Sequence, residues 1–234
     1  MRVAKSKGMA AVNICLAALM LSLSVAIGTP AATSAMGALY DSPVYRGREK
    51  GVIGLECAVS WNAAALPALL DTLKQRGIAI TFLVSGEWAE ENGELLRRMT
   101  REGHELGTMG YDPMRDGNAQ AVFRDVEKAL RAIQAVCGVR PALYYSGGRG
   151  RNSSAGAARR LGLKHVLCTA DLLSGRGDAK DILLRALDKP FDGSIFLLQP
   201  TAQAVKAAPA IIEGLMRQGF RVGAVGEALG EYTR

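Results

Sequence analysis

The sequence predicts an α/β domain built as a barrel of about seven parallel strands. From Gly51 onward, short apolar runs alternate with amphipathic helical stretches, which is the pattern of parallel strands joined by crossover helices. Seven or so such units occupy roughly 185 residues, which fits a slightly short barrel. No internal repeat interrupts them, and a chain of 234 residues suits one large domain with a sizeable core.

Apolar periodicity predicts each element in turn. The run from Val52 to Cys57 predicts the first strand, and a helix follows from Ala63 to Arg76. Leu95 and Met99 lie at helical spacing within a helix expected from Glu87 to Arg101. The remaining strands are expected at residues 78–84, 105–108, 142–145, 165–169, 194–198 and 220–222, and the remaining helices near 119–136, 153–161, 179–187 and 203–218.

Residues 1–35 have the layout of a secretory signal peptide. Arg2, Lys5 and Lys7 precede an apolar run from Ala10 to Ile27, and small residues follow it. An uncleaved membrane anchor is the alternative, because about 18 apolar residues are close to the minimum needed to span a bilayer. Both readings predict an exported, extracytoplasmic protein, either secreted or attached to the membrane through this segment alone.

Residues 36–49 are predicted to form a linker, and residues 50–230 the barrel. The net charge of +7 falls to +4 without the three basic residues of the leader, and the remaining basic residues are scattered. Because no nucleic-acid-binding motif accompanies this charge, we expect no DNA or RNA partner. A mildly cationic exported protein would be attracted to anionic wall polymers or lipid head groups.

Cysteine is sparse outside the leader. Cys57, Cys137 and Cys168 remain, and an odd number leaves at least one thiol without an intramolecular partner. Cys57 and Cys168 both fall near carboxyl ends of predicted strands, so a disulfide or a reactive thiol could form there. Burial as small hydrophobic residues is the alternative that we favour.

Three motifs, in order and spacing, resemble the polysaccharide deacetylase family, also called the NodB-homology family or carbohydrate esterase family four. They are the segments Thr81–Gly86, Gly103–Gly107 and Gly193–Pro200. The resemblance spans nearly the whole chain after the leader and implies a distorted (β/α) barrel. It also implies a metal-dependent hydrolase of N-acetyl amide bonds, which uses a divalent metal such as zinc, a carboxylate base and a histidine acid.

The metal-binding positions implied by this resemblance hold other residues. Ala58 and Ser60 match the aspartate pair that follows the first strand, and no carboxylate occurs from residue 57 to residue 70. Met109 and Pro113 match the two histidines. Thioether and proline cannot replace imidazole as ligands of such ions, so we expect no metal and no other cofactor.

The remaining catalytic positions are also changed. Tyr145 matches the arginine that orients the base, and Gln199 matches the histidine acid, although glutamine cannot supply a proton at a useful pKa. Asp171 matches a family aspartate and is retained. Only scattered carboxylates remain as possible metal donors: Glu56, Asp112, Asp116 and Asp171. Of these, Glu56, Asp112 and Asp171 are weak catalytic candidates.

The two histidines outside the leader are not expected to be catalytic. His104 matches a structural histidine that precedes the metal ligands, so we expect it to hydrogen-bond in the core. His165 is assigned no function. Aromatic residues at the predicted mouth could instead stack on sugar rings or fill the space of a lost metal centre: Trp61, Tyr111, Tyr144 and Tyr145.

The sequence therefore predicts a divergent deacetylase-like protein of carbohydrate and cell-envelope metabolism that has kept the barrel and lost catalysis. Binding of an envelope glycan, such as peptidoglycan or a related N-acetylated polymer, or of a protein partner is the leading hypothesis. The alternative is an active hydrolase with a rebuilt site, in which Asp171, Glu56 or Asp112 is the base. Gln199, Tyr145 or Ser60 would then place the substrate.

Overall fold

A computed structural model of the protein describes residues 43–231, except 62–63, 115–116, 148 and 150. The described residues belong to one compact unit that begins at Pro43. The predicted leader, residues 1–35, therefore lies outside the described residues. Within the described part of the chain, no helix is both long and apolar enough to cross a membrane.

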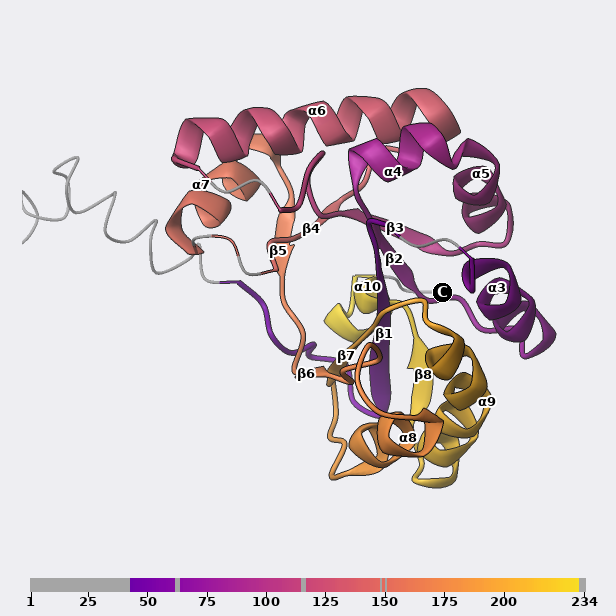
Figure 1. The fold of residues 1–234 in the computed structure, drawn as a ribbon. Coiled ribbons are helices and arrows are strands. Elements are labelled where there is room, and N and C mark those ends of the chain that lie inside the picture. The colour runs from indigo at the N-terminus through magenta and orange to yellow at the C-terminus, as the bar shows by residue number, and fades with distance from the viewer. Residues whose placement is uncertain (1–42, 62–63, 115–116, 148, 150, 232–234) are drawn as a thin grey trace, which may run out of the picture. The chain divides into compact units, whose positions relative to one another are not determined.

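The core of the compact unit is a curled sheet in which every strand pairing is parallel (Figure 1). The order is β5-β4-β3-β2-β1-β7-β6, with β8 paired to the first half of β1. The prediction of a distorted barrel of about seven parallel strands is confirmed. The strands are β1 (Val52–Val59), β2 (Thr81–Val84), β3 (Glu105–Thr108), β4 (Leu143–Tyr145), β5 (Lys164–Val166), β6 (Ala170–Asp171), β7 (Ile195–Leu198) and β8 (Arg221–Gly223).

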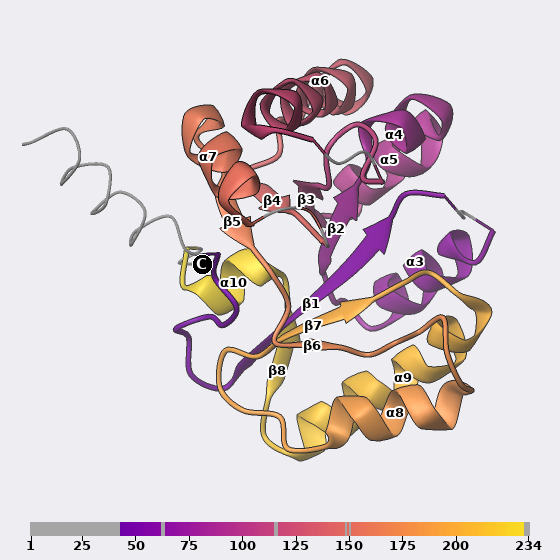
Figure 2. The same ribbon diagram turned by 60° about the vertical axis from the view of Figure 1, so that its left-hand side comes forward.

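Helices surround this sheet on its outer face, and one short helix lies on its inner side (Figure 2). Apolar side chains of the outer helices pack against alternate residues of the strands to form the largest hydrophobic cluster. The helices are α3 (Leu66–Gln75), α4 (Gly86–Glu91), α5 (Gly93–Arg101), α6 (Ala119–Cys137), α7 (Arg151–Leu161), α8 (Ala179–Leu187), α9 (Ala202–Arg217) and α10 (Val225–Leu229).

Three elements differ from the sequence prediction. The helix expected from Glu87 to Arg101 is divided into α4 and α5 at Asn92, whose φ of −119° and ψ of 41° are not helical. The strand expected from His165 to Thr169 ends at Val166 as β5, and an additional short strand, β6, follows at Ala170–Asp171. The helix α10 was missed because its five residues are too short to show a periodicity.

Side-chain alternation along β1 decides which residues face the barrel interior. Leu55, Cys57 and Val59 belong to the hydrophobic cluster that the outer helices complete. Successive side chains of a strand point to opposite faces, so Glu56 and Ala58 face the interior. The interior therefore contains a fully buried glutamate at its middle level.

The helix α10 fills the interior at the amino ends of the strands. Val225 packs there with Leu143, Val166 and Ile195, and we call these four residues the plug. A Cβ at Gly54 would lie only 3.2 Å from the Cβ of Ala228, so glycine is what allows α10 to approach β1. One end of the barrel is thus closed by the chain itself.

The described part of the segment expected to be a linker is bonded to the barrel. Val44 forms a bridge with Val166, and Arg46 forms one with Ser194. The backbone N–H of Glu49 donates to the carbonyl oxygen of Ala228 in α10 (3.0 Å). These residues connect the carboxyl end of β5 with the amino end of β7 beside the plug.

Candidate functional site

The open end of the barrel is where a site is expected, because barrel enzymes place their reacting groups after the carboxyl ends of the strands. We call this end the mouth. Half-buried residues surround it, so solvent reaches this level of the interior: Ala58 and Ser60 from β1 and the residue after it, Met109 after β3, Tyr145 of β4, Cys168 between β5 and β6, and Gln199 after β7.

Glu56 lies one interior position below the mouth. The residue is fully buried, and neither carboxyl oxygen has a hydrogen-bond partner within the described part of the chain. Burial raises the pKa of Glu56 to about 8, and the nearby charge of Glu105 adds to this rise. Because this pKa lies above 7, the side chain is predominantly a neutral carboxylic acid at pH 7.

Tyr145 and Cys168 lie within the electrostatic reach of Glu56 and share a hydrogen bond. Burial raises the pKa of the Cys168 thiol to about 12, with Glu56 and Asp171 as further causes. Burial likewise raises the pKa of Tyr145, and the effects of Cys168 and Glu56 add to it. Neither group is therefore ionised near neutral pH, and Cys168 is a poor nucleophile.

Asp171 stands at the rim of the mouth in a tight turn. Its side chain is exposed, and its Oδ1 accepts a hydrogen bond from the backbone N–H of Leu173 (2.8 Å). Leu173 has a φ of 49°, which is uncommon for a residue with a side chain. One oxygen of the retained aspartate thus stabilises the turn.

Asp112 also serves its own loop. Its Oδ1 accepts from the backbone N–H of Met114 (3.0 Å), and its backbone carbonyl accepts from Arg149. Arg149 is buried and forms an ion pair with Asp125 (2.7 Å). Asp125 in turn accepts from the backbone N–H of Asp112 (3.0 Å). Asp116, the remaining carboxylate candidate, lies outside the described residues.

The residues present do not fit the divalent metal that the family resemblance implies. Within residues 43–231, apart from the gaps given above, no group of three or more His, Cys, Asp or Glu side chains is placed to hold a metal ion. Protein sites for such ions need three or more converging donors. The changed positions Ala58, Ser60 and Met109 instead present small or apolar side chains to the mouth.

Gln199 and Pro113 complete the set of changed positions. The backbone N–H of Gln199 donates to Oγ of Ser174 (3.2 Å), which fixes the residue after β7 against the loop that follows β6. Thr201 donates to the carbonyl oxygen of the same serine (2.8 Å). Pro113 is half-buried within the loop after β3. Ser174 was not singled out from the sequence, where no motif marks it.

The four aromatic candidates separate into different environments. Trp61 is 75% exposed directly after β1, and Tyr145 faces the mouth. Tyr111 donates to Glu90 (2.8 Å) and lies beneath Lys128 of α6, so it is held between α4 and α6. The prediction that Tyr144 lines the cleft is wrong.

Tyr144 faces the outer helices because neighbouring residues of a strand point to opposite faces. It is fully buried in a cluster with Val122, Val126 and Ala158, which lie on α6 and α7. Its hydroxyl donates to Oγ of Ser154 (3.4 Å). Packing of the helices, and not ligand binding, accounts for this residue.

Both histidines lie within the fold and away from the mouth. The Nδ1 atom of His104 accepts from the backbone N–H of Ile80 (3.2 Å), and its ring meets Phe82 edge to face. Burial lowers the pKa of His104 to about 4, so the ring is neutral near pH 7. His165 stacks on Tyr144 and has a hydrogen bond to Ser146 (2.8 Å).

The three described cysteines are free thiols. Cys57 faces the outer helices, whereas Cys168 faces the mouth, so the disulfide considered between them does not form. Burial raises the pKa of Cys57, and the charge of Glu56 adds to the rise. Packing explains Cys57, in line with the usual behaviour of buried, unactivated cysteines.

Exposed apolar residues at the rim were also missed. Met114 is 90% exposed and Leu173 41% exposed, and they follow β3 and β6 as Trp61 follows β1. Three loops thus each present a large apolar side chain around one opening. Loop exposure leaves no periodic trace in a sequence, so only Trp61 was identified beforehand.

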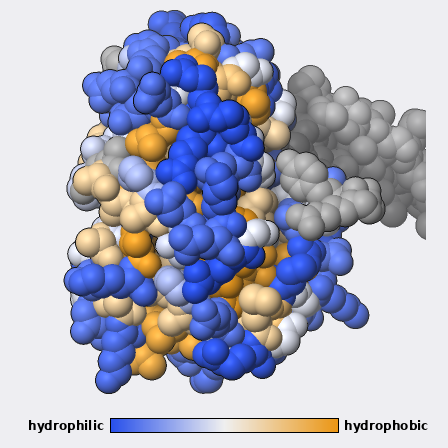
Figure 3. Space-filling model, turned by 90° about the vertical axis from the view of Figure 1, so that its right-hand side faces the viewer, coloured by the Kyte–Doolittle hydropathy of each residue, from blue (hydrophilic) through white to orange (hydrophobic). Residues whose placement is uncertain are grey.

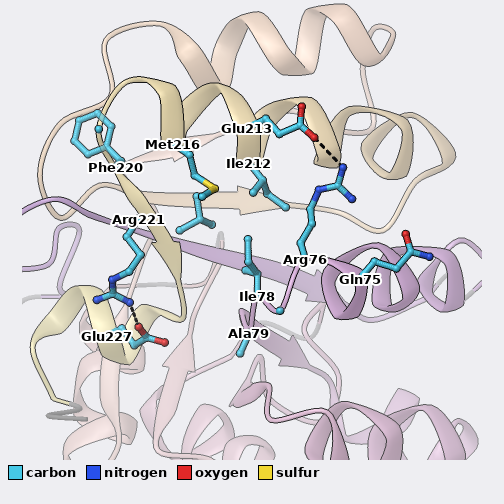
Figure 4. Close-up of a pocket in the computed structure, with 13 residues that line it drawn as sticks. Gln75, Arg76, Ile78, Ala79, Ile212, Glu213, Met216, Phe220, Arg221 and Glu227 are labelled. Atoms are coloured by element: carbon cyan, nitrogen blue, oxygen red, sulfur yellow. Dashed lines mark hydrogen bonds and ion pairs between the residues drawn. The ribbon is translucent and has the colours of Figure 1, made fainter.

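A groove with a cavity volume of about 860 Å³ lies at the other end of the strands. It runs between the end of α3, α9 and β8, and the ion pair of Arg76 with Glu213 (2.9 Å) stands at one side of it (Figure 4). Hydrophilic residues cover much of the face that carries α3, α5 and α9, with apolar patches between them (Figure 3). None of the residues singled out from the sequence lines this groove.

Comparison with known proteins decides the family. A sequence model of the family described as polysaccharide deacetylase matches residues 50–166, half of the chain. The chain belongs to the polysaccharide deacetylase family. Among solved structures, wild-type BA3943 of Bacillus anthracis, described as a CE4 family pseudoenzyme, is 26% identical with a TM-score of 0.78; the match covers 82% of this chain and 70% of that one. A BA3943 mutant of equal similarity is described as having restored enzymatic activity.

Two curated relatives of this family member are longer than the chain. The uncharacterized protein YlxY of Bacillus subtilis is 25% identical over 82% of this chain and 62% of its own length. The peptidoglycan-N-acetylglucosamine deacetylase PgdA of Listeria monocytogenes is 24% identical over 73% of this chain and 37% of its own length. The chain therefore spans less than two thirds of these relatives.

Proposed function

We propose that this family member is an exported protein of the cell envelope that no longer deacetylates and binds an N-acetylated glycan through the mouth. The observation that carries the proposal is the failure of donor side chains to converge there. The two carboxylates near the rim, half-buried Asp112 and exposed Asp171, stabilise their own loops, and the metal-ligand positions hold alanine, serine and methionine. A dication would lack the donors that amide hydrolysis by this route needs.

The rim supports binding. Trp61, Met114 and Leu173 expose apolar surface around an opening that also contains polar groups, as ligand sites commonly do. Stacking on an indole ring is favourable for the apolar face of a sugar ring. The names of the similar proteins PgdA and PdaA, a peptidoglycan-N-acetylmuramic acid deacetylase, support peptidoglycan as the polymer. A protein partner at the same rim is the other occupant that we consider.

Binding is tested by sedimentation of the purified protein with insoluble peptidoglycan. We expect the wild-type protein to sediment with the polymer and Trp61→Ala to remain largely in solution. Met216→Ala is the matched control, because Met216 is also an exposed apolar residue but lies in the groove at the other end of the barrel. Equal sedimentation of both variants would contradict binding at the mouth.

An active hydrolase is a second candidate, and Glu56 is the observation that favours it. A buried carboxyl with a raised pKa is a common feature of catalytic acids and bases. Tyr145, Gln199 and Ser60 would then position the substrate. Release of amine from N-acetyl chitooligosaccharides and from peptidoglycan separates the two functions: turnover that Glu56→Gln abolishes would replace our proposal.

A further inference from the structure

The burial of Glu56 is energetically unfavourable, and no neighbouring residue offsets this cost. A buried polar group without a hydrogen bond costs roughly 1–3 kcal/mol. Both oxygens of Glu56 are in this position within the described part of the chain. The next interior residue toward the mouth is Ala58, which has a small side chain and is half-buried.

The position of Glu56 suits contact with a ligand that enters from the mouth. Two residues along a strand span about 7 Å, so the carboxyl lies roughly one pleat repeat below the level that solvent reaches. Tyr145 and Cys168 stand on the same side of the fold and within its electrostatic reach. Ile195 of the plug is in register with Gly54, one interior position below Glu56, so the barrel is closed on that side. The carboxyl is thus the floor of the interior as seen from the mouth.

We propose that the buried, unpartnered carboxyl group of Glu56 recognises the acetamido group of a bound sugar without a metal. Its hydroxyl donates to the acetyl carbonyl oxygen, and its own carbonyl oxygen accepts from the amide N–H. A carboxylic acid and a secondary amide each offer one donor beside one acceptor, so both orphan oxygens of Glu56 gain a partner. This assignment rests on the proposed glycan binding and deepens it.

The surroundings of Glu56 favour a neutral ligand group over an ammonium group. Glu105 of β3 is the charged residue that acts on it, and Tyr145, Cys57 and Cys168 are the titratable groups on which it acts. Asp171 acts on the same tyrosine and cysteine from β6. Burial beside another carboxylate keeps the proton on Glu56, and a protonated acid offers an ammonium ion no charge to bind.

The test is a calorimetric titration with an N-acetylglucosamine oligomer and with the matched glucosamine oligomer that lacks acetyl groups. Wild-type protein is expected to bind the acetylated oligomer more tightly, by at least about tenfold. Glu56→Leu should lose at least about tenfold in affinity, whereas Glu56→Gln should stay within about threefold, because a carboxamide also offers a donor and an acceptor. Glu213→Gln, an exposed substitution in the distant groove, is the control.

The pH dependence of affinity for the acetylated oligomer separates a binding role of Glu56 from a purely structural one. Wild-type affinity should be constant from pH 6 to 7 and should decline above about 8, where Glu56 ionises. Glu56→Gln cannot ionise and should show no decline. Thermal unfolding followed by circular dichroism checks that each variant is folded.

The outcomes separate this inference from the proposed function. Equal binding of the acetylated oligomer by Glu56→Leu and wild type, or preference for the glucosamine oligomer, overturns the role of Glu56 and leaves glycan binding standing. Absence of binding to either oligomer and to peptidoglycan by the wild-type protein overturns both. Loss in Glu56→Leu together with retention in Glu56→Gln supports the inference.

Discussion

Two glutamates at the same level of the barrel have opposite surroundings. Glu56 and Glu105 are in register through Thr81, which pairs with both residues across β1, β2 and β3. Glu105 accepts hydrogen bonds from the hydroxyl of Thr81 and from the backbone N–H of Gly226 (3.0 Å). Glu56 accepts none within the described residues. The carboxyl group beside α10 is hydrogen-bonded, and the carboxyl group in the same register on β1 is not.

The different surroundings of Glu105 and Glu56 indicate whether each residue contributes to stability or to binding. Thr81 also accepts from the backbone N–H of Val225 (2.8 Å), so the first turn of α10 is bound to two strands at once. Such a satisfied network specifies one arrangement of the closed end. An unsatisfied buried carboxyl stabilises nothing by itself, and such a group calls for a functional explanation or a bound water or ion. We therefore assign stability to Glu105 and binding to Glu56.

The largest effect is expected from Glu105→Ala. The substitution leaves the hydroxyl of Thr81 and the backbone N–H of Gly226 without their acceptor, which should lower the free energy of unfolding by about 3 kcal/mol. Urea denaturation measures this quantity. A loss below about 1 kcal/mol would show that the network contributes less than its geometry indicates.

The opposite sign is expected from Glu56→Leu. Replacing an unsatisfied buried carboxyl by an apolar side chain of similar size should raise the free energy of unfolding by about 2 kcal/mol at pH 8. Val59→Ala, in the same strand but facing the outer helices, should instead be destabilising and serves as the matched control. If Glu56→Leu destabilised the protein, Glu56 would have a stabilising partner that the structure does not show.

The pH dependence of stability should follow the raised pKa of Glu56. In the unfolded chain the carboxyl ionises near its ordinary value of 4.5, whereas in the folded protein it ionises near 8. The free energy of unfolding is therefore highest below pH 4.5 and is lost progressively as pH rises through 8, because ionising the buried group is costly only in the folded state. Urea titrations between pH 5 and 9 should show this decline in the wild type and a smaller one in Glu56→Gln. If the free energy of unfolding depended on pH equally in the wild type and in Glu56→Gln, the raised pKa of Glu56 would be contradicted.

The smallest change in stability is expected from Trp61→Ala. Because the indole is mostly exposed, its loss should alter the free energy of unfolding by less than about 0.5 kcal/mol. Binding to peptidoglycan should nevertheless weaken. A stability loss above about 1 kcal/mol would place Trp61 in the packing of the loop and weaken its assignment to the binding rim.

Much of the fold could be predicted because strands and long helices have periodic patterns. The short helix α10 and the break at Asn92 could not, since tertiary contacts and one non-helical residue determine them. Tyr144 and Tyr145 show the limit at the site. Alternation requires that they face opposite sides, but only the packing against α6 and α7 decides which one turns outward.

The candidate carboxylates show a similar limit. Glu56, Asp112 and Asp171 were equally weak candidates in the sequence. Backbone hydrogen bonds in the loops account for the two aspartates, and complete burial distinguishes the glutamate. Burial and loop hydrogen bonding depend on neighbours far apart in the chain, so no local motif could separate the three.

The claim that donor side chains do not converge at the mouth is tested most directly by metal content. The purified protein would be incubated with excess Zn²⁺, dialysed, and measured by inductively coupled plasma mass spectrometry alongside an assay of amine release from peptidoglycan. We predict zinc well below one ion per chain and no release of amine. One tightly held ion per chain together with turnover would contradict the account.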